Sequence, residues 1–144
     1  MSQISTWIEF AMQQMAGESY LDRFLSGEFA LGKVLMMGNN YLPEDQSASD
    51  VLPGKTRMAS VQAEQFVQRY QIVDHHANDA TGFSATVFFD TETNSYTLSF
   101  RSSEYAADVS GGDRSRDIFG ADAEVKNAGF AFAQLISMTR YFED

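Results

Sequence analysis

The sequence contains no cysteine and has few basic residues. The lack of cysteine excludes disulfide bonds, thiolate metal sites and cysteine nucleophiles, although it does not fix the compartment in which the protein works. Ten Lys and Arg stand against twenty Asp and Glu, which gives a formal net charge of −10. Because nucleic acids and anionic membrane surfaces attract basic proteins, we expect neither of them as a partner.

Long apolar runs are also absent from the sequence. No stretch approaches the roughly 18 consecutive apolar residues of a transmembrane helix. The first six residues, MSQIST, offer neither the positive region nor the apolar region of a standard signal peptide. We therefore expect no transmembrane segment and no standard N-terminal signal peptide.

The composition that remains is typical of a folded domain. Of the 144 residues, 44% are hydrophobic and twelve are Phe. A chain of this length can bury a core without disulfides or metals. We expect residues 1–144 to form a single domain or the truncated N-terminal portion of one. A helical lead-in and a loop would occupy 1–54, and a helix, a hairpin, an acidic loop and a helix would occupy 55–144.

The clearest structural signal is a pair of strands around residues 82–90 and 96–104. Apolar and small polar residues alternate in both stretches, which is the period of two of half-buried strands. The intervening residues 90–94, DTETN, are polar turn formers. The pattern therefore predicts an antiparallel β-hairpin.

Apolar residues at helical spacing predict helices on both sides of this hairpin. The N-terminal helix should cover 3–16 and end at Gly17. Its apolar face is expected to pack in the core and consists of Ile4, Trp7, Ile8, Ala11, Met12 and Met15. Further helices are predicted over 20–31, over 55–71 with Ser60 as a candidate cap, and over 123–141, with a loop over 38–54. The predicted fold class is α/β, α+β in appearance: N-terminal helices, one antiparallel hairpin and a C-terminal helix.

Two groups of residues suggest metal or acid–base chemistry. His75 and His76 are adjacent in a segment, 72–79, that we predict to be a solvated loop leading into the hairpin. Neighbouring side chains of an extended segment point to opposite sides, so this pair favours no metal site, although His could serve as a base. The acidic residues of 102–124 could bind calcium, but their spacing fits no EF-hand loop and favours a solvated charged loop. We predict neither a metal nor a cofactor.

A possible serine nucleophile is excluded by its sequence context. Residues 82–86, GFSAT, approach the pattern G-x-S-x-G, but Thr86 occupies the last small position. A nucleophile elbow also needs a helix after the serine, whereas a β-branched and aromatic strand follows Ser84. Ser84 is therefore predicted to be a strand residue. No other motif of a complete catalytic site occurs in the chain.

Several stretches resemble a known family in content and in order. They are TGFSATVF at 81–88, YTLSFRSSE at 96–104, and AGFAFAQ at 128–134, with an Asp-rich loop before the last one. Together they resemble the start of bacterial α/β-hydrolase lipases, in particular class 3-like lipases of large calcium-repeat (RTX-type) secreted polypeptides. Residues 62–75 resemble the same group's lead-in, so the likeness covers about 60–142. The most specific part is FRSSE at 100–104, which is similar to the family's F-R-G-T-E.

The resemblance implies part of an active site. The residue that matches the family's oxyanion-hole donor is Ser103, which would stabilise charge that develops in the transition state. Ser102 stands where the family has Gly, and a side chain would be strained there if the backbone needs a positive φ. An alternative is that Ser102 and Ser103 simply end a strand. By the same resemblance, the nucleophile in G-H-S-x-G and the Asp and His of the triad would follow beyond residue 144.

Two functions are therefore predicted. The first is the N-terminal segment of a secreted serine lipase or esterase, which acts on carboxylic esters of lipids, is inactive alone and leaves the cell without an N-terminal signal peptide. The second is a stand-alone, non-catalytic interaction or accessory domain, cytoplasmic if the likeness to secreted proteins does not apply. Because two strands make a poor sheet with an exposed edge, we also predict self-association through that edge or dependence on a missing C-terminal hydrolase portion.

Overall fold

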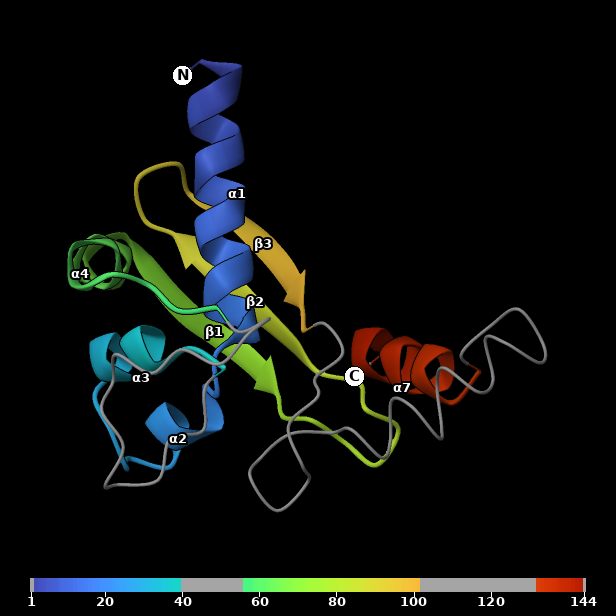
Figure 1. Ribbon diagram of the computed structural model, residues 1–144. Helices are drawn as coiled ribbons and strands as arrows, with labels where there is room; N and C mark the ends of the chain where they lie inside the picture. The colour runs from blue at the N-terminus through green and yellow to red at the C-terminus, as the bar shows by residue number, and fades with distance from the viewer. Residues whose placement is uncertain (1, 40–55, 102–131, 144) are drawn as a thin grey trace. The chain divides into compact units, whose positions relative to one another are not determined.

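The computed structural model describes residues 2–39, 56–101 and 132–143 (Figure 1). The chain divides into two compact units. The first consists of Met1–His75 and Thr86–Phe100, and the second of His76–Ala85 and Arg101–Asp144. Within the described residues, helices accompany a small three-stranded antiparallel sheet. The predicted mixture of helices and antiparallel strands is thereby confirmed at this level of detail.

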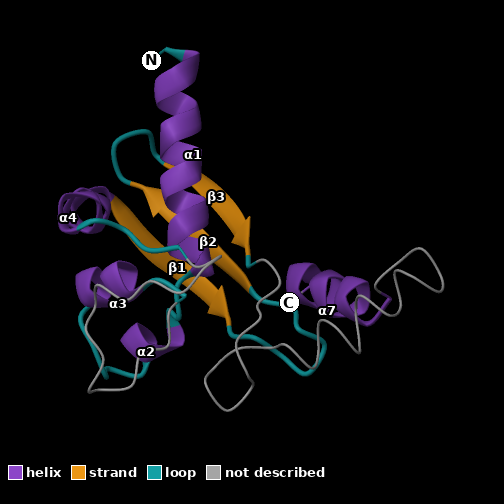
Figure 2. Cartoon of the chain, viewed as in Figure 1, coloured by secondary structure: helices purple, strands orange, loops and turns teal. Residues whose placement is uncertain are grey.

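The sheet consists of β1 (Tyr70–His76), β2 (Ala85–Asp90) and β3 (Ser95–Phe100), in the order β1-β2-β3 (Figure 2). The hairpin formed by β2 and β3 confirms the prediction, although β2 begins three residues later than the predicted stretch. In its turn, the Asp90 carboxylate accepts the backbone N–H of Glu92 at 2.9 Å, and Asn94 has a φ of 53°. Asn tolerates this left-handed backbone better than most residues do, which explains its place there.

The strand β1 corrects the prediction of a loop at 72–79. Residues 70–76 are extended and pair with β2, so the described part of the chain contributes three strands to the sheet rather than two. The β-branched Ile72 and Val73 favour this conformation, and β2 supplies the hydrogen-bond partners that a local pattern cannot reveal.

The described residues of the first unit form four helices: α1 (Gln3–Glu18), α2 (Asp22–Leu25), α3 (Leu31–Met37) and α4 (Ser60–Arg69). α1 begins where predicted, with the Ser2 hydroxyl accepting the N–H of Ser5 at 3.2 Å. It continues two residues beyond the predicted end at residue 16. The helix predicted over 20–31 is wrong as a single element, because the chain turns between α2 and α3 at Gly27, whose φ is 81°.

α4 is shorter than the helix predicted over 55–71. It begins at Ser60, and the residue before it, Ala59, is the N-cap in place of the predicted Ser60. The Gln62 side chain accepts the Ala59 N–H at 2.9 Å, which is one half of a capping box. The helix ends at Arg69 because Tyr70 is already extended and starts β1.

The core of the first unit lies where α1, α3, α4 and the sheet meet. Its central side chain, Phe66, is fully buried and packs on Tyr70, with ring centroids 4.6 Å apart, and edge-on against Phe88 at 5.4 Å. The buried cluster consists of Ala16, Leu21, Val34, Leu35, Met58, Ala63, Phe66, Tyr70 and Phe88.

The predicted burial of the α1 apolar face is only half right. Met12 and Met15 pack against the core, but Ile4, Trp7 and Ile8 are 66%, 60% and 56% exposed. β3 contacts the second half of α1, where the Ser99 hydroxyl donates to Gln14 Oε1 at 2.8 Å. The N-terminal end of the helix projects beyond the sheet (Figure 1).

In the second unit, α7 spans Phe132–Glu143. The predicted final helix, 123–141, is described only from residue 132 onward, and its earlier part lies outside the described residues. The Tyr141 ring of α7 lies 5.6 Å from the His76 ring and 6.1 Å from the Phe83 ring. Among the described helices, none is both long and apolar enough to cross a membrane.

Candidate functional site

The predicted oxyanion-hole residue, Ser103, lies outside the described residues, as do Ser102 and the acidic stretch 102–124. Its role stays a prediction. The structure does describe the residues that precede this stretch. β3 ends at Phe100, and the backbone N–H of Arg101 donates to the Ser84 carbonyl at 3.1 Å.

The contacts of Ser84 are those of a structural residue. It lies one residue before β2, is 2% exposed, and its hydroxyl donates to the His76 carbonyl oxygen at 2.9 Å. A buried hydroxyl whose proton is directed at a backbone carbonyl is poorly placed to attack a substrate. The structure thus agrees with the sequence in assigning Ser84 no nucleophilic role.

The two histidines have separate partners. His75 Nδ1 lies 2.9 Å from the Thr86 hydroxyl, and His76 Nε2 lies 3.3 Å from Asp79 Oδ2. Alternation along β1 explains why neighbouring rings diverge. Within the described part of the chain, no group of three or more His, Cys, Asp or Glu residues is arranged to hold a metal ion.

Asp79 organises the turn between β1 and β2. Its Oδ1 accepts the Thr81 N–H at 2.7 Å, the Thr81 hydroxyl at 2.6 Å and the Phe83 N–H at 3.2 Å. Burial raises the pKa of the Asp79 carboxyl, but the hydrogen bonds from Thr81 hold it below its usual value. Ser137 of α7 lies 3.3 Å from the Thr81 hydroxyl, so this serine joins the Asp79 turn.

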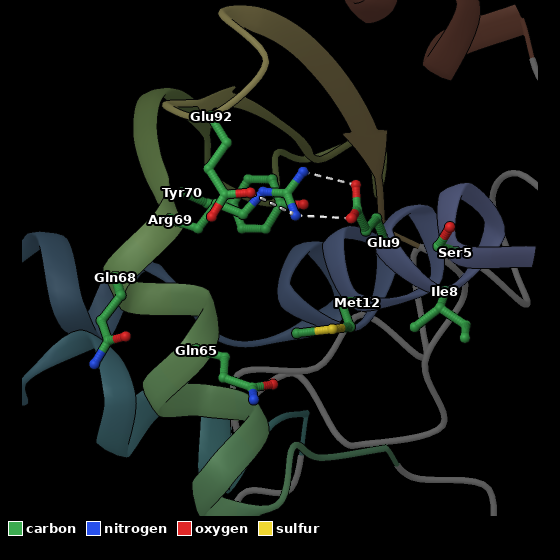
Figure 3. A pocket seen from close by; sticks show the side chains of 9 residues that line it. All are labelled: Ser5, Ile8, Glu9, Met12, Gln65, Gln68, Arg69, Tyr70 and Glu92. Atoms are coloured by element: carbon green, nitrogen blue, oxygen red, sulfur yellow. Dashed lines mark hydrogen bonds and ion pairs between the residues drawn. The ribbon is translucent and has the colours of Figure 1, made fainter. Parts of the chain in front are cut away.

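The most elaborate polar site is a groove that the sequence did not reveal (Figure 3). It lies in the first unit, has a volume of about 370 Å³ and is bordered by α1, α4 and the β2–β3 turn. We call it the Arg69 groove. Its lining residues are Ser5, Ile8, Glu9, Met12, Gln65, Gln68, Arg69, Tyr70 and Glu92.

Arg69 holds three carboxylates at the end of this groove. Its Nη1 and Nη2 donate to the two oxygens of Glu9, both at 2.7 Å (Figure 3). Its Nε and Nη2 donate to the two oxygens of Asp90 at 2.9 and 2.7 Å, and Glu92 Oε2 lies 3.2 Å from Nη1. We call this arrangement the Arg69 clamp. It joins α1, α4 and the hairpin turn.

The electrostatics of the clamp follow from its burial. The Asp90 side chain is only 5% exposed and that of Arg69 16%. Hydrogen bonds from Arg69 hold the pKa of Asp90 well below its usual range, and hydrogen bonds to Asp90 and Glu9 raise the pKa of Arg69.

The clamp therefore stabilises the unit and supplies no catalytic group. All the donor nitrogens of Arg69 face carboxylates of the chain, so the guanidinium has no free edge for a substrate anion. The other walls carry apolar, amide and hydroxyl groups, as in Met12, Gln65 and Ser5. Burial raises the pKa of the Tyr70 hydroxyl, which keeps it protonated near neutral pH.

A scan against protein-family models gives no match to this chain, and searches of curated proteins and of solved structures give no significant match.

Proposed function

We propose that this chain is the N-terminal segment of a lipase- or esterase-like serine hydrolase that acts on carboxylic esters of lipids. The observation that carries the proposal is the motif FRSSE at 100–104, together with the position of its first residue at the end of β3. By the resemblance, Ser103 would be an oxyanion-hole donor in the loop that follows this strand, where it would stabilise charge that develops in the transition state. The described strands would then be the first part of an α/β-hydrolase sheet.

The chain is proposed to be inactive alone. Its sequence contains no G-x-S-x-G motif, and the one serine that approaches this pattern, Ser84, is buried against a backbone carbonyl. An oxyanion-hole donor without a nucleophile cannot carry out acyl transfer. The nucleophile, acid and base would come from a further portion of the hydrolase. This portion and the present segment would together form one domain. Secretion without an N-terminal signal peptide follows from the same resemblance.

The test combines gene sequence with kinetics. We expect the 144-residue chain to show no hydrolysis of p-nitrophenyl butyrate or p-nitrophenyl palmitate above buffer. Reading the source DNA past the Asp144 codon should give an open frame that contains G-H-S-x-G. In that longer protein, Ser103→Ala should lower kcat by about a hundredfold with little change in KM, because its donor acts mainly on the transition state. A stop codon after Asp144, or an unchanged kcat, would refute the proposal.

A second candidate is a non-catalytic interaction domain, and one observation favours it. The first half of α1 exposes Ile4, Trp7, Ile8 and Phe10, all by more than half of their surface. Exposed aromatic and aliphatic side chains on one element are typical of association surfaces. A stop codon after Asp144 would select this function over the hydrolase, and self-association through a sheet edge would then be one of its forms.

A further inference from the structure

The first half of α1 is inverted relative to an ordinary surface helix. Such a helix turns its apolar stripe toward the protein and its polar residues toward water. In α1, by contrast, Glu9 turns inward and bonds to Arg69 at 2.7 Å, and Ser5 borders the same groove (Figure 3). The large apolar side chains are each exposed by more than half of their surface. They are Ile4, Trp7, Ile8 and Phe10, and we call them the outward face of α1.

The outward face is a continuous feature of a regular helix. Trp7 lies three residues after Ile4 and three before Phe10, and Ile8 lies four residues after Ile4. Side chains at these spacings are neighbours on a helix surface. The N-terminal end of α1, which carries them, projects beyond the sheet (Figure 1). The four side chains therefore form one apolar surface at an end of the first unit.

The outward face also lacks charge. Between residues 2 and 17 the only charged residue is Glu9, which is paired with Arg69. The whole chain has a net charge of −10, which opposes contact with a second copy and with an anionic membrane. A surface with an apolar interior and no net charge meets neither obstacle. A zwitterionic lipid surface has both properties, and the amphipathic ring of a tryptophan such as Trp7 is suited to the boundary between lipid and water.

We propose that the outward face of α1 docks on a zwitterionic lipid surface. The helix would lie in the plane of the interface, with Ile4, Trp7 and Phe10 buried by about 5–10 Å among the headgroups and upper acyl chains. Many interfacial helices add basic residues that attract anionic lipids, whereas binding here would depend on apolar burial. The choice of lipid over a second copy also rests on the proposed function, because the esters of a lipid hydrolase lie in such surfaces.

Binding can be measured on the 144-residue chain through Trp7, its single tryptophan. We titrate the chain with vesicles of dioleoylphosphatidylcholine. We expect the Trp7 emission to shift saturably to shorter wavelength, to be quenched by brominated phosphatidylcholine, and to lose its sensitivity to acrylamide. Replacing part of the lipid by phosphatidylglycerol should weaken binding at low ionic strength, because both partners are then negative. No shift with phosphatidylcholine, or tighter binding with phosphatidylglycerol, would overturn the proposal.

Matched variants separate the outward face from general apolar exposure. Ile4→Gln/Phe10→Gln keeps the fluorescent reporter and should weaken vesicle binding by about tenfold or more, because it removes apolar area from the interface. Val61→Gln, at an exposed apolar residue of α4, should leave the affinity unchanged. Circular dichroism and urea unfolding check that each variant is folded. Equal binding by the double variant and the parent chain would show that another surface meets the lipid.

Other occupants of this face give different results. A shift of Trp7 emission that follows protein concentration and not vesicle concentration, with dimers in sedimentation, would replace the lipid by a second copy. Protection of Trp7 from acrylamide in the dilute monomer would mean that the chain covers this face itself, which would also overturn the proposal.

These measurements need no catalysis, so they are independent of the kinetic test above. Vesicle binding in a chain whose frame stops after Asp144 would leave a lipid-binding accessory domain and refute the hydrolase alone. No vesicle binding, with the effect of Ser103→Ala retained in the longer protein, would overturn this inference alone.

Discussion

Arg69 shows how one residue can fix the positions of three elements. Its guanidinium makes paired hydrogen bonds with Glu9 of α1 and with Asp90 at the end of β2. Its own backbone carbonyl accepts the Thr91 hydroxyl at 2.7 Å, so the backbone and the side chain hold the same turn. Planar, paired contacts of this kind are stronger than a single ion pair and are less screened when buried.

The first prediction concerns stability and pH. Arg69→Met should lower the free energy of unfolding near neutral pH by about 3 kcal/mol, because it leaves the buried Asp90 and the partly buried Glu9 without a counter-ion. In the parent, the pKa of Asp90 is lower folded than unfolded, so the unfolded state takes up its proton first as pH falls. Stability should therefore decline from about pH 5 through about pH 4 and below, and Arg69→Met should flatten this decline.

Urea unfolding at several pH values measures both effects. Glu92→Gln is the matched control, because the Glu92 side chain is 66% exposed and its contact with Arg69 should contribute little. A parent chain whose stability rises on acidification, or an Arg69→Met variant as stable as Glu92→Gln, would contradict this account of the clamp.

Sequence alone could not reveal the clamp. Its partners stand 60 and 21 residues away from Arg69, and each of the three residues has an ordinary local context. The sequence was sufficient to exclude Ser84 as a nucleophile, because the pattern of a strand follows this residue directly. Ser103 was found by resemblance and stays a prediction.

At the scale of elements, the end of α3 is joined to the segment that leads into α4. The Asn39 N–H donates to the Thr56 carbonyl at 3.2 Å, and the Asn39 side chain accepts the Thr56 N–H at 2.9 Å. Gly38 makes this contact possible. Its φ is 63°, and an added Cβ would lie 1.9 Å from the Thr56 carbonyl oxygen.

The second prediction compares two glycines of this region. Gly38→Ala should destabilise the protein by about 3 kcal/mol or more, because the new side chain meets both a backbone clash and an unfavourable φ. Gly32→Ala, inside α3, meets only Val67 Cγ2 at 3.9 Å and should be neutral or stabilising by up to about 1 kcal/mol. Thermal and urea unfolding of both variants provide the comparison. Similar losses in the two variants would rule out the steric explanation.

Elements were predictable where their signal is local. The hairpin has two alternating stretches and a turn between them, all within residues 82–104, so it was found. β1 was missed because its residues, YQIVDHH, lack clear alternation and depend on pairing with β2. The predicted burial of the α1 apolar face was half wrong for a similar reason. Periodicity shows which residues share a helix face, but it does not show how far the sheet extends beneath that face.

At the scale of the whole molecule, the apolar surface of α1 stands out against a strongly acidic composition. Between residues 2 and 17 the only charged residue is Glu9, and Arg69 neutralises it. The exposed side chains Ile4, Trp7, Ile8 and Phe10 therefore meet solvent with no charge among them. Such a surface favours contact with a further segment or partner despite the repulsion between chains of net charge −10.

The third prediction follows from this surface. The purified chain should bind an apolar dye or self-associate in sedimentation, and its single tryptophan, Trp7, should be readily quenched by acrylamide in the monomer. Ile4→Gln/Trp7→Gln/Phe10→Gln should remove dye binding or association while changing the free energy of unfolding by no more than about 1 kcal/mol, because exposed side chains add little to the core. Val61→Gln, at an exposed apolar residue of α4, is the control and should leave both properties unchanged. A compact monomer that binds no dye would show that α1 needs no cover, and would remove the main structural reason to look for a further segment or partner.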